Sequence, residues 1–295
     1  MKILSKPKGN AEEYGRWSVN PYVGCTHGCL YCYLKKGVWK NNLGQNKPVL
    51  KKGIINEEHA FHIAMAEILE NREEIVKDGG LFMTFTSDPC IPETRDLFFR
   101  ITKDAMEERV PVVLLTKNAD FTKEYCYENI RWRLTTNSYG HNVAFGWTLT
   151  GRNGLEQNAH SNEMRMQEMS RVYRDGFKTW VSIEPVIDFP SSLDMIKQAL
   201  AAGCQHFKIG LLTNNTHVVR KDFQFGEHHF DAYNRDECID FIHNVMRIVE
   251  AGDGKATVYW KQSFRDFLGE EDFARAIVGY NNIVGKDWSM FKKED

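Results

Sequence analysis

The sequence lacks any long hydrophobic run. No stretch approaches the roughly 18 consecutive apolar residues of a membrane-spanning helix, so we expect no membrane span. Residues 1–8 already contain three lysines and lack the apolar core of a signal peptide. Proline is scarce, with 8 residues in 295, and neither repeats nor low-complexity tracts occur. Together these absences exclude collagen-like, disordered and membrane-spanning classes of protein.

Cysteine is also sparse, with seven residues in the chain. An odd number at this low density does not suit the disulfide framework of a secreted protein, so we expect a reducing, cytoplasmic location. The length of 295 residues is sufficient for one large α/β domain with an extensive core.

Acidic residues are missing between Tyr14 and Asn56. Residues 1–56 contain ten Lys and Arg residues against only Glu12 and Glu13, which gives this segment a charge of +8. The total charge is -2, so residues 57–295 carry -10. Three of the seven cysteines fall within the basic segment, which makes it the first place to look for function.

Short apolar runs alternate with amphipathic stretches along most of the chain. Continuous apolar runs indicate a parallel sheet covered on both faces, and six strand–helix units fit a partial (β/α)6 TIM-type barrel. We expect one domain over residues 1–295, with a core at about 15–212 and an extension at about 213–295 that includes a strand at 257–260. The expected strands are 18–24, 81–86, 112–116, 143–148, 178–183 and 206–210, and the expected helices are 57–77, 93–109, 122–134, 161–175, 191–202 and 235–250.

The cysteines Cys25, Cys29 and Cys32 form a C-x3-C-x2-C pattern around Gly28. Three neighbouring thiols cannot all pair with one another, so a metal centre is the natural interpretation. A structural zinc site needs four ligands, and His27 is the only nearby fourth candidate. A 4Fe-4S cluster held by three thiolates instead leaves one iron open to a small molecule.

This pattern, with Tyr31 before the third cysteine, resembles the signature of the radical S-adenosylmethionine (radical SAM) superfamily, and residues 20–34 are similar to its spore photoproduct lyase-like branch. The resemblance implies a full or partial barrel and a 4Fe-4S cluster on Cys25, Cys29 and Cys32 whose open iron binds S-adenosylmethionine. It further implies that one electron cleaves this cofactor to methionine and a 5′-deoxyadenosyl radical, which abstracts hydrogen from a substrate. The electron would come from an external reductant of flavodoxin or ferredoxin type.

Polar residues follow the expected strands, where the chemistry of a barrel is found. The resemblance implies that Ser87, Asp88 and Lys117 hold the methionine moiety, with the first two accepting from its ammonium and the lysine facing its carboxylate. Structural alternatives stay open: Ser87 and Asp88 could open a turn before Pro89, with Asp88 capping the next helix, and Lys117 could be a solvated loop residue.

The rest of the cofactor offers ribose hydroxyls and an adenine ring. Thr148, Thr150 or Glu184 suit the ribose, and adenine can lie against Tyr31. Glu184 has the structural alternative of an ion pair with a basic neighbour. The segment 259–263 is expected to add one more polar group to this end of the barrel.

One position departs from the lyase pattern. Phe85 stands where the lyases carry a hydrogen-donating cysteine, which argues against lyase-type DNA repair while leaving radical generation untouched. Cys90 is a candidate replacement donor if it faces the barrel mouth, with a small buried hydrophobe as its alternative. Tyr31 and Tyr33 flank the third cysteine and could form a tyrosine relay.

The basic segment suggests a nucleic-acid substrate, because cations and stacking aromatic rings bind single-stranded or flipped-out bases. The alternative is a solvated loop that offsets the charge of the cluster. A function of another class, a non-catalytic zinc- or cluster-binding nucleic-acid module, also stays open. Glu227, His228 and His229 with His217 form a weaker candidate metal group. The aromatic residues of the basic segment are Tyr14, Trp17, Tyr22, Tyr31, Tyr33 and Trp39.

Overall fold

A computed structural model describes residues 2–36, 40–136, 142–213, 223–225, 227–252, 256–285 and 290–291. Its centre is one sheet in the order β1-β2-β5-β6-β7-β8-β9-β12, in which all strands but β1 run parallel. The strands of this sheet are β1 Leu4–Ser5, β2 Trp17–Val19, β5 Leu81–Met83, β6 Val112–Thr116, β7 Val143–Thr148, β8 Lys178–Val186, β9 His206–Leu211 and β12 Thr257–Trp260. This confirms the α/β class and the partial TIM-type barrel.

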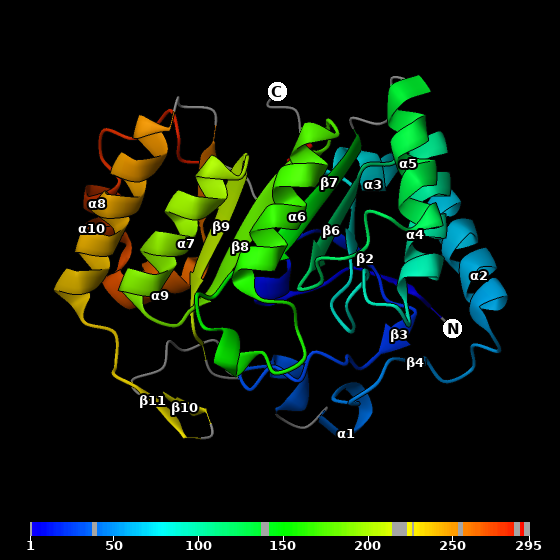
Figure 1. The fold of residues 1–295 in the computed structure, drawn as a ribbon, viewed down its shortest axis with the longest axis horizontal. Helices are drawn as coiled ribbons and strands as arrows, with labels where there is room; N and C mark the ends of the chain where they lie inside the picture. The colour runs from blue at the N-terminus through cyan, green and yellow to red at the C-terminus, as the bar shows by residue number, and fades with distance from the viewer. Residues whose placement is uncertain are drawn as a thin grey trace.

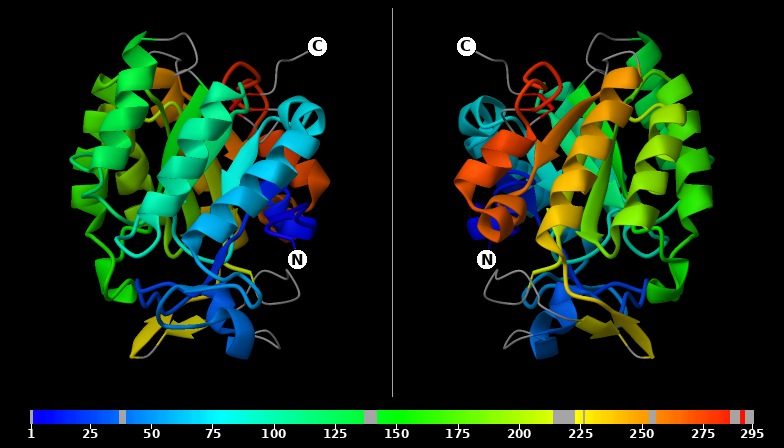
Figure 2. Two further views of the ribbon diagram at one scale, coloured as in Figure 1. Left: turned by 90° about the vertical axis from the view of Figure 1, so that its right-hand side faces the viewer. Right: turned by 90° about the vertical axis from the view of Figure 1, so that its left-hand side faces the viewer.

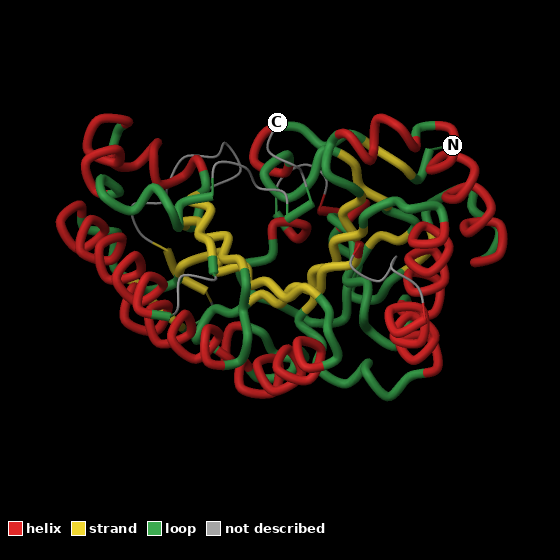
Figure 3. Tube along the Cα trace, turned by 90° about the horizontal axis from the view of Figure 1, so that it is seen from above, coloured by secondary structure: helices red, strands yellow, loops and turns green. Residues whose placement is uncertain are grey.

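The sheet curves into an open arc with helices along its convex side (Figure 3). Between each of β2, β5, β6, β7, β8 and β9 and the next strand of this sheet the chain forms at least one helix, as Figure 1 shows by its colour sequence. The helices are α1 Lys40–Leu43, α2 Glu57–Glu70, α3 Arg72–Lys77, α4 Arg95–Glu107, α5 Tyr125–Thr136, α6 Asn162–Arg174, α7 Phe189–Ala201, α8 Arg235–Ala251, α9 Gln262–Leu268 and α10 Glu270–Ala276.

Two expected elements are divided in the structure. The helix expected at 57–77 breaks at Asn71, whose side chain bonds the Glu67 carbonyl and so competes with the helical backbone. The strand expected at 18–24 leaves the main sheet after Val19, and Pro21 has no N–H to continue a ladder. Beyond it β3 (Tyr22–Val23) pairs instead with β4 (Val49–Leu50).

The residues after 212 complete the sheet. β12 pairs in parallel with β9, so the strand expected at 257–260 is confirmed. A hairpin of β10 (Phe223–Phe225) and β11 (His228–Phe230) lies at the same end of the molecule as α1, as both views of Figure 2 show. No helix in the described part of the chain is both long and apolar enough to span a bilayer.

The strands divide their side chains between two faces. The main core fills the space between the sheet and the helices, with Met83, Leu114 and Val181 among its members. On the concave face a smaller cluster joins Phe82, Val113, Ala144 and Trp180 to Tyr14 from the segment before β2. Since side chains alternate along a strand, the polar residues that share parity with this smaller cluster also point into the concave side.

Candidate active site at the cysteine loop

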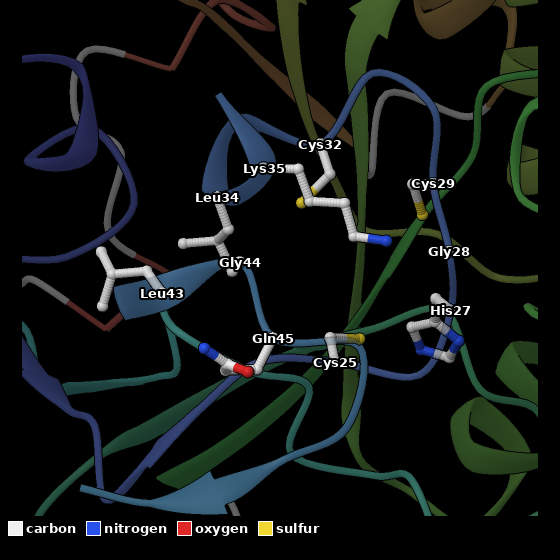
Figure 4. Close-up of a pocket in the computed structure, with 10 residues that line it drawn as sticks. All are labelled: Cys25, His27, Gly28, Cys29, Cys32, Leu34, Lys35, Leu43, Gly44 and Gln45. Atoms are coloured by element: carbon white, nitrogen blue, oxygen red, sulfur yellow. The ribbon is translucent and has the colours of Figure 1, made fainter. Parts of the chain in front are cut away.

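The three predicted ligands lie on the loop between β3 and a short 3-10 helix, Tyr33–Lys35. All seven cysteines of the chain are free thiols. Cys25, Cys29 and Cys32 line a single cavity together with residues of the following segment, and Figure 4 shows the three sulfur atoms around one opening. The structure therefore brings the sequence-predicted triad together.

Backbone hydrogen bonds attach this loop to three other parts of the chain. Gly24 N donates to Thr86 O at 2.9 Å, Cys25 N to Gln45 O at 3.1 Å, and Leu30 N to Leu155 O at 2.9 Å. Gly24 has φ +93, and a Cβ there would lie 2.5 Å from the Lys47 carbonyl oxygen. Only glycine suits this close approach.

The donor set fits an iron–sulfur cluster better than a single metal ion. Three cysteine thiols at this spacing are typical cluster ligands. The candidate fourth zinc ligand, His27, is buried and bonds Asp88 through one ring nitrogen, with 2.8 Å between Nε2 and Oδ2, while its Nδ1 has no hydrogen-bond partner among the described residues. Within the described ranges, no group of three or more His, Cys, Asp or Glu side chains is arranged to hold one metal ion. Glu227, His228 and His229 lie exposed on the hairpin turn and β11, and His217 falls outside the described residues.

Burial controls the charge of the thiols. It raises the pKa of Cys29 to about 11 and that of Cys25 above its usual range. Both thiols are therefore protonated at neutral pH in the free protein. Binding a cluster would displace these protons, so cluster binding is coupled to pH.

Asp88 is buried and surrounded by protein donors. Its carboxylate accepts from His27, from Cys90 N at 2.9 Å, from Thr116 Oγ1 at 2.7 Å and from Lys117 N at 2.9 Å. Burial alone would raise the pKa of Asp88, but the charge of His27 and these hydrogen bonds lower it. Asp88 thus joins the cysteine loop to the ends of β5 and β6, and its contact with the cofactor ammonium stays a prediction.

Ser87 and Lys117 have unused polar groups beside the loop. The buried Ser87 Oγ has no hydrogen-bond partner in the described chain. Lys117 is half-buried, and its Nζ lies 5.7 Å from the centre of the Tyr31 ring. Burial lowers the pKa of Lys117, but negative charge at Cys29 and Glu156 outweighs this and raises it. These groups are free to meet a ligand with an ammonium and a carboxylate.

A buried network behind the loop was not predicted from the sequence. The Tyr31 hydroxyl donates to Glu156, whose other oxygen accepts from Arg165 Nη2 at 2.6 Å, and both charged side chains are fully buried. Arg165 Nη1 also donates to the Thr148 carbonyl at 2.8 Å. The available signal was an arginine on the apolar face of α6, between Asn162 and Met169.

A second polar cluster lies on the concave face of the sheet. Glu184 accepts two hydrogen bonds from Lys261 Nζ, at 2.7 and 2.8 Å, and one from the Tyr14 hydroxyl, which also lies 2.7 Å from Ser182 Oγ. The structural alternative for Glu184, an ion pair, is therefore present. Lys261 belongs to the segment expected to add a polar group, whereas Tyr14 was not predicted as a site residue.

The remaining candidates have diverse surroundings. Thr148 and Thr150 are buried, and Thr150 Oγ1 accepts from Arg152 N at 3.3 Å. Tyr33 is 61% exposed and its hydroxyl donates to the Phe85 carbonyl. Cys90 is fully buried in the main core, so it does not face the mouth of the barrel.

The described aromatic residues of the basic segment do not form an exposed stacking platform. Tyr14, Trp17 and Tyr22 are buried, and Tyr31 is half-buried with its hydroxyl bound to Glu156. Each of the first three packs in a hydrophobic cluster. Trp39 lies outside the described residues. Apart from Tyr33, the described rings belong to the interior.

Comparisons with known proteins support the fold. No family model matches the chain. The uncharacterized protein MJ0683 of Methanocaldococcus jannaschii is 24% identical over 210 residues, which cover 66% of this chain and 70% of that protein.

Solved structures extend over more of the chain. Two variants of spore photoproduct lyase have TM-scores of 0.59 and 0.60 at 15% and 16% identity, covering 86% and 88% of this chain and 79% and 80% of theirs. Streptococcus suis SuiB has a TM-score of 0.54 at 10% identity, covering 85% of this chain and 50% of its own. The chain shares the fold of these proteins.

Proposed function

We propose that this protein is a radical SAM enzyme in which Cys25, Cys29 and Cys32 hold a 4Fe-4S cluster. The observation that carries the proposal is the placing of three free thiols around one cavity beside the carboxyl ends of a part-barrel sheet. Barrel enzymes carry their chemistry at this end of the strands. The radical SAM fold supports the same assignment.

When bound, the cluster would supply one electron that cleaves S-adenosylmethionine to methionine and a 5′-deoxyadenosyl radical, which takes hydrogen from a substrate. The protein would bind and orient the cluster, the cofactor and the substrate, and it would exclude water from them. The Lys117 ammonium suits the cofactor carboxylate, and Ser87 Oγ is an available acceptor for its ammonium. Asp88 keeps the cysteine loop against the ends of β5 and β6. It would therefore affect cofactor binding by positioning the loop that holds the cluster.

The other end of the cofactor has fewer candidates. Tyr31 has its ring held by the bond from its hydroxyl to Glu156, which suits a fixed surface for adenine. Thr148 and Glu184 point from β7 and β8 toward the concave side, where ribose hydroxyls would find acceptors. Thr150 follows β7 and is the weaker ribose candidate because Arg152 already donates to its hydroxyl.

Phe85 and Cys90 limit which reactions can follow radical formation, because neither residue offers an accessible hydrogen donor. A phenyl ring has no weak S–H bond to donate, and the Cys90 thiol is buried in the core. We therefore do not extend the proposal to lyase-type DNA repair. A zinc-binding module is disfavoured because no three His, Cys, Asp or Glu side chains of the described residues are arranged around one metal ion. We further propose a reducing, cytoplasmic location, which fits seven free thiols, and an external one-electron reductant of flavodoxin or ferredoxin type.

The test is reductive cleavage by protein purified without oxygen and reconstituted with iron and sulfide. With dithionite and S-adenosylmethionine, we expect visible iron–sulfur absorbance and release of 5′-deoxyadenosine. Cys29→Ala should lose both, because three protein ligands are needed to retain the cluster. The matched control is Cys126→Ala, at a half-buried thiol on α5, which should keep both. Stoichiometric zinc in place of iron, or full turnover by Cys29→Ala, would refute the assignment.

A further inference from the structure

The segment at residues 155–158, here named the clamp, runs along the cysteine loop. Its backbone at Glu156 forms an antiparallel bridge with Cys29. Its other bonds to the loop run from Leu30 N to Leu155 O at 2.9 Å, from Asn158 N to His27 O at 2.9 Å and from Asn158 Nδ2 to Thr26 O at 3.0 Å. The clamp therefore follows the loop from the residue after its first cysteine to the residue after its second.

A buried ion pair anchors the clamp in the interior. The Glu156 carboxylate accepts from the Tyr31 hydroxyl and from Arg165 Nη2, the latter at 2.6 Å, and both members of the pair are fully buried. Arg165 Nη1 donates to the Thr148 carbonyl at 2.8 Å. A buried charge needs such partners in place of water, so the carboxylate cannot leave them cheaply. The pair thus connects the cysteine loop to the end of β7 and to α6.

The same pair places charge close to one of the ligands. Burial is the main cause of the raised pKa of Cys29, and among the nearby charges Glu156 raises it more than Arg165 lowers it. The two charges therefore do not cancel at this sulfur, and the carboxylate has the larger effect. Buried charges are only weakly screened by salt. A net negative charge beside a redox centre opposes the gain of an electron.

We propose that Glu156 and Arg165 are positioning residues, which hold the cysteine loop in its ligand-binding arrangement before a cluster binds, and that the Glu156 carboxylate lowers the reduction potential of the centre held there. The contacts that carry the first part all join two protein groups, so they do not depend on a cluster. The second part rests on the proposed function. A lower potential makes the reduced centre a stronger one-electron donor, as reductive cleavage of a sulfonium requires.

The first test uses hydrogen exchange in the protein before reconstitution. Glu156→Gln keeps the shape of the side chain and removes its charge, so the amide of Leu30 should exchange about tenfold faster or more, relative to the amides of β6 as a reference for global unfolding. Glu168→Gln, at a buried carboxylate of α6 that bonds Thr122 N, is the matched control and should stay within about twofold. Equal exchange at Leu30 in the two variants would overturn the positioning role.

A second variant separates position from charge. Arg165→Lys keeps the positive charge but lacks the fork that bonds Glu156 and the Thr148 carbonyl together. It should therefore speed exchange at Leu30 while leaving the potential close to that of the wild type. This variant also carries the exchange test if Glu156→Gln does not fold.

The midpoint potential of the reconstituted centre, measured by redox titration with electron paramagnetic resonance, tests the second part. Glu156→Gln should raise the equilibrium constant for reduction by about tenfold, which is about 59 mV for one electron. Glu168→Gln should stay within about threefold of the wild type. An unchanged or lower potential in Glu156→Gln would overturn the effect of the carboxylate. If the wild-type protein binds no iron–sulfur cluster, the proposed function fails together with the effect on potential, and the exchange comparison still decides the positioning role.

Discussion

Two buried carboxylates, Asp88 and Glu156, hold the cysteine loop from different sides. Asp88 accepts four hydrogen bonds from the loop and from the region of β5 and β6. The Glu156 side chain accepts from Tyr31 and Arg165, and the Glu156 backbone forms an antiparallel β-bridge with Cys29. A buried charge is tolerated only when such partners replace water. The orientation of the thiols therefore depends on residues that are not themselves ligands.

Removing one partner of the buried ion pair should be costly. Arg165→Met leaves Glu156 charged and buried without its cation, and we expect the free energy of unfolding to fall by about 3–5 kcal/mol. Urea denaturation of the anaerobic protein measures this loss. Arg174→Met, at an exposed position of the same helix, should change it by less than about 0.5 kcal/mol. Equal effects of the two substitutions would show that the pair contributes no particular stability.

At the scale of elements, the contact between β7 and β8 depends on a missing side chain. Gly146 lies opposite Trp180 in the parallel register, and a Cβ at this glycine would stand 2.1 Å from the Trp180 ring. Glycine within a strand ordinarily weakens it. Here it leaves the space that the indole occupies on the concave face, where Trp180 packs with Tyr14 and Phe82.

Gly146→Ala should therefore be destabilising although it adds only a methyl group. The buried ring cannot move aside freely, and we expect a loss of about 1–3 kcal/mol, with a change in tryptophan fluorescence of the folded state. Gly154→Ala is the matched control, because a Cβ there meets only His228 at 3.8 Å or more. If urea midpoints show the two variants to be equally stable, the packing argument is wrong.

At the scale of the whole molecule, the concave face contains a histidine that affects acid stability. His206 is buried at the start of β9, with 2.7 Å between its Nδ1 and Thr257 Oγ1. Burial, with a smaller effect from the charge of Lys208, lowers the pKa of His206 to about 3. The folded protein therefore keeps this imidazole neutral well into the acidic range.

This shift determines the sign of a pH effect on stability. An unfolded histidine has a pKa of about 6.5, so between about pH 6.5 and 3 the unfolded chain binds the extra proton. As the pH is lowered through this window, His206 should reduce the free energy of unfolding by up to about 1.4 kcal/mol per pH unit. Urea titrations of His206→Leu should show a correspondingly flatter slope than wild type. His229→Leu, an exposed control on β11, should keep the wild-type slope; a flattened slope in both variants would contradict this origin.

Local patterns in the sequence predicted most strands of the main sheet and the helices that pack on it, and they indicated the cysteine loop as a candidate ligand loop. Asn56 caps α2 through its side chain, which accepts from His59 N at 2.8 Å. The helix expected at 161–175 and the strand expected at 257–260 are present as α6 and β12. These features depend on residues close together in the chain, where periodicity and caps report directly on structure. The cysteine motif is equally local, because its spacing alone identifies candidate ligands.

Only the tertiary structure decided which groups face one another. Tyr14 bonds Glu184 across 170 positions, and Lys261, which directly follows β12 of the extension, reaches the same carboxylate. The sequence by itself determined a +8 segment bearing three cysteines. The fold buried several of its aromatic rings and left Lys40, Lys47 and Lys52 exposed. The physical reason is that charge and thiol spacing are properties of neighbours, whereas burial and pairing follow from the topology that joins distant strands.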